Sequence, residues 1–99
     1  MNFPYDKIPV DYMQEGVKRW VEHGVMPGSF LRAVLENDLK GAVGNADSNN
    51  LAALRYWVEW FYDYAPAGCW GSALKVRAWQ DHQGFEGYLN AAENETTRT

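Results

Sequence analysis

The segment Leu51–Ala65, with the sequence LAALRYWVEWFYDYA, decides the fold class of this chain. Its aliphatic residues recur at helical spacing, and six of the nine residues from Tyr56 to Tyr64 are aromatic. This pattern predicts a helix that is apolar on more than one face, which is too much apolar surface for an ordinary surface helix. The predicted core stripe consists of Leu51, Leu54, Val58, Phe61 and Ala65.

A second apolar face of the same helix carries aromatic side chains, which we call the aromatic ridge: Tyr56, Trp57, Trp60 and Tyr64. Such a face either packs under another element of the domain or contacts a partner, because tryptophan and tyrosine serve cores and binding hot spots equally well. We therefore predict the ridge as a partner-binding surface, with Trp57 shared between the ridge and the core. If the N-terminal arm or the extension after Trp79 covers the ridge, Trp70 with the helix start that follows it becomes the better candidate.

Two further helices are predicted before this segment. The first runs from Val10 to His23 with Gly24 as its C-terminal cap, and the second runs from Ser29, whose hydroxyl is suited to capping, to Val43. Residues 1–9 contain two prolines and are predicted to form an extended arm on the domain. The side chains expected to hold this arm in place are Phe3, Tyr5 and Ile8.

The remaining elements follow from capping and breaking signals. Asp47 or Ser48 can cap the aromatic helix, which should end before Pro66, and Ser72 can cap a fourth helix that continues past Trp79. A short fifth helix is predicted after Gly84, within a single helical domain of residues 10–92. Residues 93–99 are predicted to be a flexible tail. The fold class is therefore all-α, a compact orthogonal bundle of four to five helices.

Composition excludes several function classes. The 99 residues suffice for one domain, and the net charge of −4 opposes DNA binding, which normally needs a basic surface. A single cysteine excludes an internal disulfide, and the sequence shows neither a secretion signal nor a membrane span. We therefore expect a cytoplasmic protein with no DNA or membrane partner.

Asp38 is the most unusual polar position, because it falls within an apolar stripe of the second predicted helix, formed by Leu31, Leu35 and Ala42. A carboxylate there needs compensation. One interpretation is that Asp38 accepts hydrogen bonds from backbone N–H groups at a helix start or pairs with an arginine. The other makes Asn37 and Asp38 a ligand-binding pair.

A second candidate site surrounds Trp70, which precedes the predicted helix start at Ser72. There the indole can stack on a nucleobase beside free backbone N–H groups, while a cation neutralises a phosphate. The basic side chains considered for that role are Lys75, Arg77 and Arg55. The alternative is that Trp70 covers the core and Ser72 only caps the helix.

No pattern indicates catalysis or metal binding. Cys69 has no assigned base, and the two histidines, His23 and His82, show no metal-ligand spacing with it. The acidic residues Asp63, Asp81 and Glu86 offer no reason to choose any acid/base pair. We predict no catalytic residue, cofactor or metal, and keep a small enzyme of unknown reaction as an alternative.

Two segments resemble a family of small uncharacterised phage and prophage proteins. The first is PGSFLRAVLENDL at residues 27–39, and the second is APAGCWGSALKV at residues 65–76. The resemblance extends from about Ile8 to Trp79. It implies a phage accessory protein in the host cytoplasm, expected to inhibit a host antiviral defence by stoichiometric binding to a host protein or to a second copy. The alternative is sequestration of a nucleotide immune signal.

Overall fold

The computed structural model describes residues 3–87, which contain helices and no strand. The prediction of a compact all-α domain is confirmed. The α-helices are α1 (Gln14–His23), α2 (Ser29–Leu35), α3 (Leu39–Asn45), α4 (Ser48–Ala52), α5 (Leu54–Tyr64) and α6 (Ala73–Asp81). Short 3-10 turns lie at Tyr5–Lys7, Asp11–Met13 and Ala67–Cys69.

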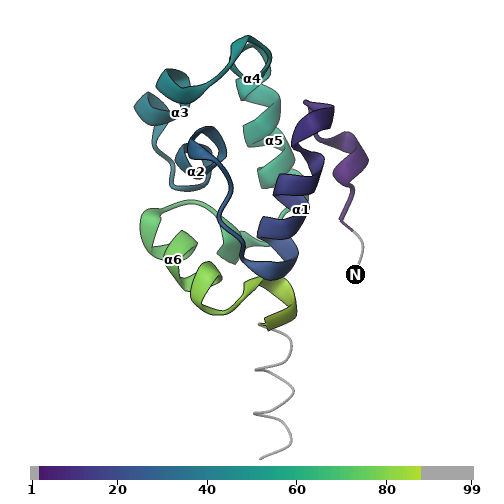
Figure 1. The fold of residues 1–99 in the computed structure, drawn as a ribbon, viewed down its shortest axis with the longest axis vertical. Coiled ribbons are helices and arrows are strands. Elements are labelled where there is room, and N and C mark those ends of the chain that lie inside the picture. Colours follow the sequence, from purple (N-terminus) through teal and green to yellow (C-terminus); the bar gives the residue numbers. More distant parts are fainter. Residues whose placement is uncertain (1–2, 88–99) are drawn as a thin grey trace, which may run out of the picture.

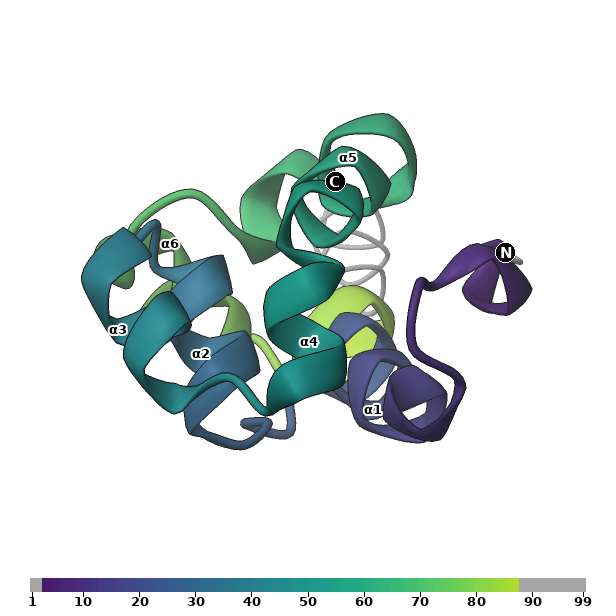
Figure 2. The same cartoon turned by 90° about the horizontal axis from the view of Figure 1, so that it is seen from above.

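The aromatic helix α5 lies between two groups of elements. Figure 1 shows α2 and α3 on one side, α1 with the N-terminal arm on the other, and α6 at the lower end of the domain. The view from above in Figure 2 gives the same arrangement, with α4 leading into α5. A helix flanked in this way can bury two of its faces.

The first predicted helix has its expected C-terminal cap. Gly24 adopts a left-handed φ of 70° and its N–H donates to the Trp20 carbonyl oxygen at 2.9 Å. Gly84 also has a positive φ, 76°, and its backbone lies against this cap: an added Cβ on Gly84 would meet the backbone nitrogen of His23 at 2.4 Å. The closing contact between α1 and the chain after α6 therefore requires glycine at both positions.

The second predicted helix is wrong as a single element. It breaks into α2 and α3 at Asn37, whose φ is 62°. Asp38 then begins α3, and its carboxylate accepts from the Gly41 N–H at 2.9 Å. Gly28, rather than Ser29, is the N-terminal cap residue of α2, without a side-chain hydrogen bond. Asp38 is exposed and satisfies a helix start, so its predicted place within a buried stripe is corrected.

The aromatic helix also divides, at Ala53, into α4 and α5. The predicted Asp47 cap is confirmed, since its carboxylate accepts from the Asn50 N–H at 2.7 Å. The predicted end before Pro66 is confirmed as well, because α5 ends at Tyr64. Leu51 therefore belongs to α4 and not to the helix that carries the rest of its predicted stripe.

Indole groups hold the centre of the domain together. The Trp20 N–H donates to the Cys69 carbonyl oxygen at 3.0 Å, and the Trp79 N–H donates to the Trp20 carbonyl oxygen at 3.0 Å. Each of these side chains is buried, so each N–H would cost about 1–3 kcal/mol without an acceptor. These bonds connect α1, the turn before Trp70, and α6.

The fourth predicted helix corresponds to α6. The hydroxyl of Ser72 accepts from the Lys75 N–H at 3.2 Å, which confirms the predicted cap, and the helix ends at Asp81. Residues 84–87 are helical again, as predicted for the fifth helix. The rest of the predicted fifth helix, which includes Tyr88, Leu89 and Ala92, and the tail 93–99 lie outside the described residues.

Candidate functional site

The aromatic ridge is mostly part of the core. Trp57 and Trp60 are 0% and 2% exposed, and their N–H groups donate to the Asn50 side-chain oxygen and the Pro4 carbonyl oxygen, both at 3.0 Å. Trp57 and Trp60 are therefore unavailable to a partner in the folded domain, which corrects their assignment as contact residues. Tyr56 and Tyr64 remain exposed.

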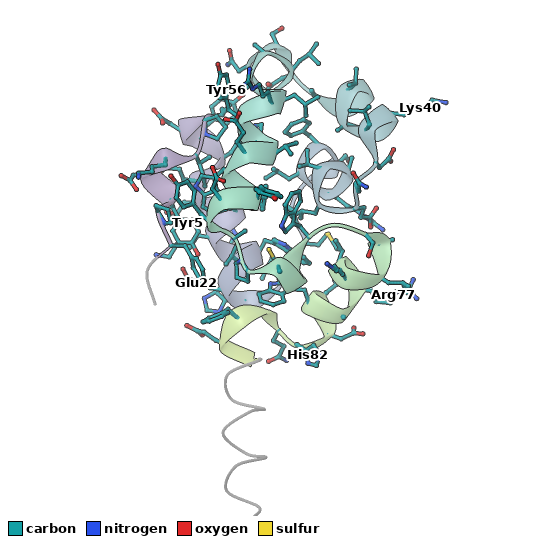
Figure 3. The ribbon with its side chains drawn as sticks, turned by 180° about the vertical axis from the view of Figure 1, so that it is seen from behind. Tyr5, Glu22, Lys40, Tyr56, Arg77 and His82 are labelled. Atoms are coloured by element: carbon teal, nitrogen blue, oxygen red, sulfur yellow. The ribbon has the colours of Figure 1, made fainter. Side chains whose placement is uncertain are left out.

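The N-terminal arm is the element that covers the ridge. The Tyr5 ring stacks on Trp60 with centroids 6.0 Å apart, Ile8 is buried, and the Lys7 ammonium lies 5.3 Å from the Tyr64 ring centroid. Figure 3 shows Tyr5 beside α5. The arm contains the 3-10 turn Tyr5–Lys7 rather than being extended throughout, and this turn brings the tyrosine ring onto α5.

Two of the five residues predicted as the core stripe lie at the surface. Val58 is 43% exposed and Leu51 is also exposed, while Leu54 is half-buried. Phe61 is the one stripe residue that is fully buried, and Ala65 is half-buried. The prediction is therefore wrong for Leu51 and Val58, because the larger aromatic side chains of α5 occupy the interior and turn the aliphatic face outward.

This outward face lines an apolar groove between α3 and α5, which we call the α3–α5 groove. Leu54 and Val58 form one wall, and Leu39, 70% exposed, forms the other. The hollow measures about 80 Å³. Its remaining lining residues are Ala33, Val34, Asn37, Asp38, Ala42 and Trp70. Val43, one turn after Leu39, extends the exposed apolar surface of α3.

The break at Asn37 creates this groove. The Asp38 N–H donates to the Ala33 carbonyl oxygen at 2.8 Å, which closes α2 and lets α3 start in a new direction. Leu39, the first residue of α3, then lines the groove across from Val58. The two residues predicted as a ligand-binding pair thus lie at the edge of an apolar hollow.

The residues predicted for a nucleotide site do not form one cluster. Trp70 lines the α3–α5 groove and also a second hollow beside Lys75. Arg55 pairs with Glu59 at 2.9 Å at the surface, and Arg77 lines a different hollow with Arg32 and Glu36. Figure 3 shows Arg77 pointing outward from α6. Sequence reasoning missed Tyr62, which lines the hollow containing Trp70 and Lys75.

The groups that could support chemistry are the Cys69 thiol and a cluster of Glu22, His23 and Glu86. Cys69 is fully buried, and this burial raises the pKa of its thiol to about 12. The ligand atoms of Glu22, His23 and Glu86 lie within 4.8 Å of one another, with the latter two side chains exposed. His23 Nδ1 and Glu86 Oε2 are 3.4 Å apart at the surface, and exposed acidic groups are common without a bound metal ion.

Comparison with protein-family models, with curated proteins and with solved structures finds no match. The resemblance to small phage proteins therefore stays a prediction. Within residues 3–87, no helix has both the length and the apolar character needed to cross a membrane.

Proposed function

We propose that this protein is a non-enzymatic binding protein whose α3–α5 groove receives an aliphatic side chain of a protein partner. The observation that carries the proposal is the groove itself, where exposed Leu39 and Val58 stand on either side of an apolar hollow. Large aliphatic side chains gain free energy when a partner removes them from water, at about 25 cal/mol per Å² of apolar area.

The size of the hollow favours a side chain over a cofactor. A cavity of about 150 Å³ holds benzene, and ligand sites for larger molecules measure about 300–1,000 Å³. The α3–α5 groove, at about 80 Å³, has room for part of one aliphatic side chain. A partner segment presenting one such side chain, with polar neighbours, matches this site.

Polar groups around the groove match the rim of a protein interface. Asp38 lies at the edge of the hollow, and Arg55 and Glu59 occupy exposed positions next to Val58 on α5. Interfaces commonly surround an apolar centre with a polar rim that fixes orientation. The groove therefore suits specific binding better than non-specific aggregation.

The resemblance to small phage proteins supplies the biological setting of the proposal. In that setting the partner is a host defence protein in the cytoplasm, inhibited by stoichiometric binding, or a second copy of this chain. Neither setting requires a catalytic residue.

Differential capture tests the proposal. Wild-type protein and the variants Val58→Glu and Leu39→Glu are used as baits in lysate of the cells that encode the protein, with Tyr56→Glu as the matched surface control. We expect a protein, or the bait's own chain, to be retained by wild type and Tyr56→Glu and lost by both groove variants. Equal retention by all four baits would reject the groove.

A further inference from the structure

A second hollow lies at the start of α6, beside the α3–α5 groove. It measures about 370 Å³, within the range of small-molecule sites. Its lining consists of Tyr62, Ala65, Ala67, Trp70, Gly71 and Lys75. Trp70 is common to both hollows, whereas Tyr62 and Lys75 line only this one. The two sites can therefore be tested with separate variants.

Two aromatic side chains line this hollow. Tyr62 is 80% exposed on α5, and half-buried Trp70 packs against Phe61 with ring centroids 5.7 Å apart. The Phe61 contact holds the Trp70 ring in place. Within residues 3–87, Trp70 is also the tryptophan whose indole N–H has no acceptor, in contrast to the four buried indoles. A planar aromatic ligand can stack on this ring, and a polar group at the edge of the ring can accept from that N–H.

Lys75 brings a positive charge to the same hollow. Its Nζ lies 3.6 Å from the position that a Cβ on Gly71 would occupy, so the lysine side chain folds back over the glycine. Gly71 has a φ of 120°, which favours glycine. Within the described part of the chain, the Lys75 ammonium forms no ion pair with a carboxylate. It is available to an anionic group of a ligand.

Lys75 belongs to the first turn of α6. Ser72 accepts from the Lys75 N–H, which leaves the N–H groups of Ala73 and Leu74 without intrahelical partners, as in any helix start. These donors and the helix dipole favour a negative charge at that end. The aromatic walls and the cation thus face one ligand-sized space.

We infer that this hollow binds a small nucleotide, with the base stacked at Trp70 and Tyr62 and the phosphate held by Lys75. Aromatic stacking contributes about 1–3 kcal/mol per base, and a charge-assisted hydrogen bond fixes the phosphate. The hollow offers one cation, Lys75, and the chain has a net charge of −4. These charges suit a mononucleotide or dinucleotide better than a nucleic-acid strand.

Titration of the full chain with adenosine and guanosine 5′-monophosphates and with a cyclic dinucleotide tests this inference. Because Trp70 is the most exposed tryptophan, a stacked base should quench tryptophan fluorescence saturably. Adenosine and inorganic phosphate, tested separately, should each bind at least about tenfold more weakly, since each lacks one half of the recognition. Absence of saturable quenching and of a thermal shift with all three nucleotides would overturn the inference.

Variants locate the site. Lys75→Gln should weaken nucleotide binding about tenfold and reduce its salt dependence, and Tyr62→Ala should weaken it without unfolding the domain. Arg77→Gln is the matched control, because it removes one charge from the same helix outside this hollow. Unchanged affinity in both Lys75→Gln and Tyr62→Ala would also overturn it. Val58→Glu should leave nucleotide affinity intact, which separates this site from the α3–α5 groove.

Discussion

The indole N–H of Trp60 donates to the carbonyl oxygen of Pro4 at 3.0 Å, which joins the centre of α5 to the N-terminal arm. This contact helps to bury Trp60, so the centre of the aromatic ridge packs within the domain. The candidate binding surface therefore lies on the opposite side of α5, where Val58 and Leu39 line the α3–α5 groove.

Trp60 should therefore behave as a core residue. Trp60→Ala is expected to lower the free energy of unfolding by about 3–5 kcal/mol, because it removes a large buried side chain and leaves the arm without its contact. Tyr56→Ala, on the exposed side of the same helix, should change it by less than about 0.5 kcal/mol. Urea unfolding measures both. Similar stabilities of the two variants would contradict the packing of the arm.

Gly84 should tolerate no side chain. Gly84→Ala is expected to cost about 2–4 kcal/mol, since a positive φ and a 2.4 Å approach to the His23 backbone both oppose a Cβ. Gly44→Ala is the matched control: Gly44 lies in α3 with nothing near its Cβ position, so alanine should stabilise by about 0.5–1 kcal/mol. Thermal unfolding of both variants measures these opposite changes in stability. If Gly84→Ala and Gly44→Ala destabilised the protein equally, the close approach of Gly84 to the His23 backbone would be contradicted.

Asp47 should contribute pH-dependent stability. The Tyr12 hydroxyl donates to its carboxylate, and this bond, followed by that from the Asn50 N–H, lowers the pKa of Asp47. The contribution is complete above the unfolded-state pKa of about 3.9 and disappears as pH falls through the lower folded value.

Tyr12→Phe removes the larger of the two causes. Near neutral pH, wild type should have a higher urea midpoint than Tyr12→Phe. This difference should disappear as the pH falls below about 4. Tyr62→Phe, which changes an exposed hydroxyl elsewhere, should show no such trend. If the difference in urea midpoint between wild type and Tyr12→Phe stayed constant at acid pH, the link between Asp47 protonation and stability would be excluded.

Cys69 should be chemically inert in the native protein. Its burial and raised pKa, about 12, leave almost no thiolate at neutral pH, and the thiolate is the reactive form. A thiol reagent such as iodoacetamide should label it only after unfolding in urea, as followed by intact-protein mass. Rapid labelling without denaturant would contradict its position in the core.

Local signals in the sequence predicted much of the fold. Gly24, Asp47 and Ser72 cap helices as expected, because a cap depends on neighbouring residues alone. The break at Asn37 was missed, since a non-glycine residue with positive φ is uncommon and the apolar pattern continues across it. Because α3 starts after this break, Leu39 of α3 forms one wall of the α3–α5 groove.

The inward face of α5 was misassigned for a different reason. Trp57, Trp60, Phe61 and Tyr64 are spaced as one helical stripe of their own, and this signal competes with the aliphatic stripe of Leu54 and Val58. Spacing alone does not decide which stripe faces inward. Contacts distant in sequence decide it: Tyr5 and Pro4 contact Trp60, and Phe30 packs against Trp57. For the same reason, local spacing did not predict that Tyr62 lies beside the hollow of Trp70 and Lys75.

Site-specific photo-crosslinking tests the proposed binding surface most directly. A benzophenone amino acid is placed at position 58 in the α3–α5 groove or at position 56 on the other side of α5, and the cells that encode the protein are irradiated. The proposal predicts a discrete covalent adduct, with a cellular protein or with a second copy, from position 58 and not from position 56. No adduct from position 58, or equal adducts from both positions, would contradict a partner site in the groove.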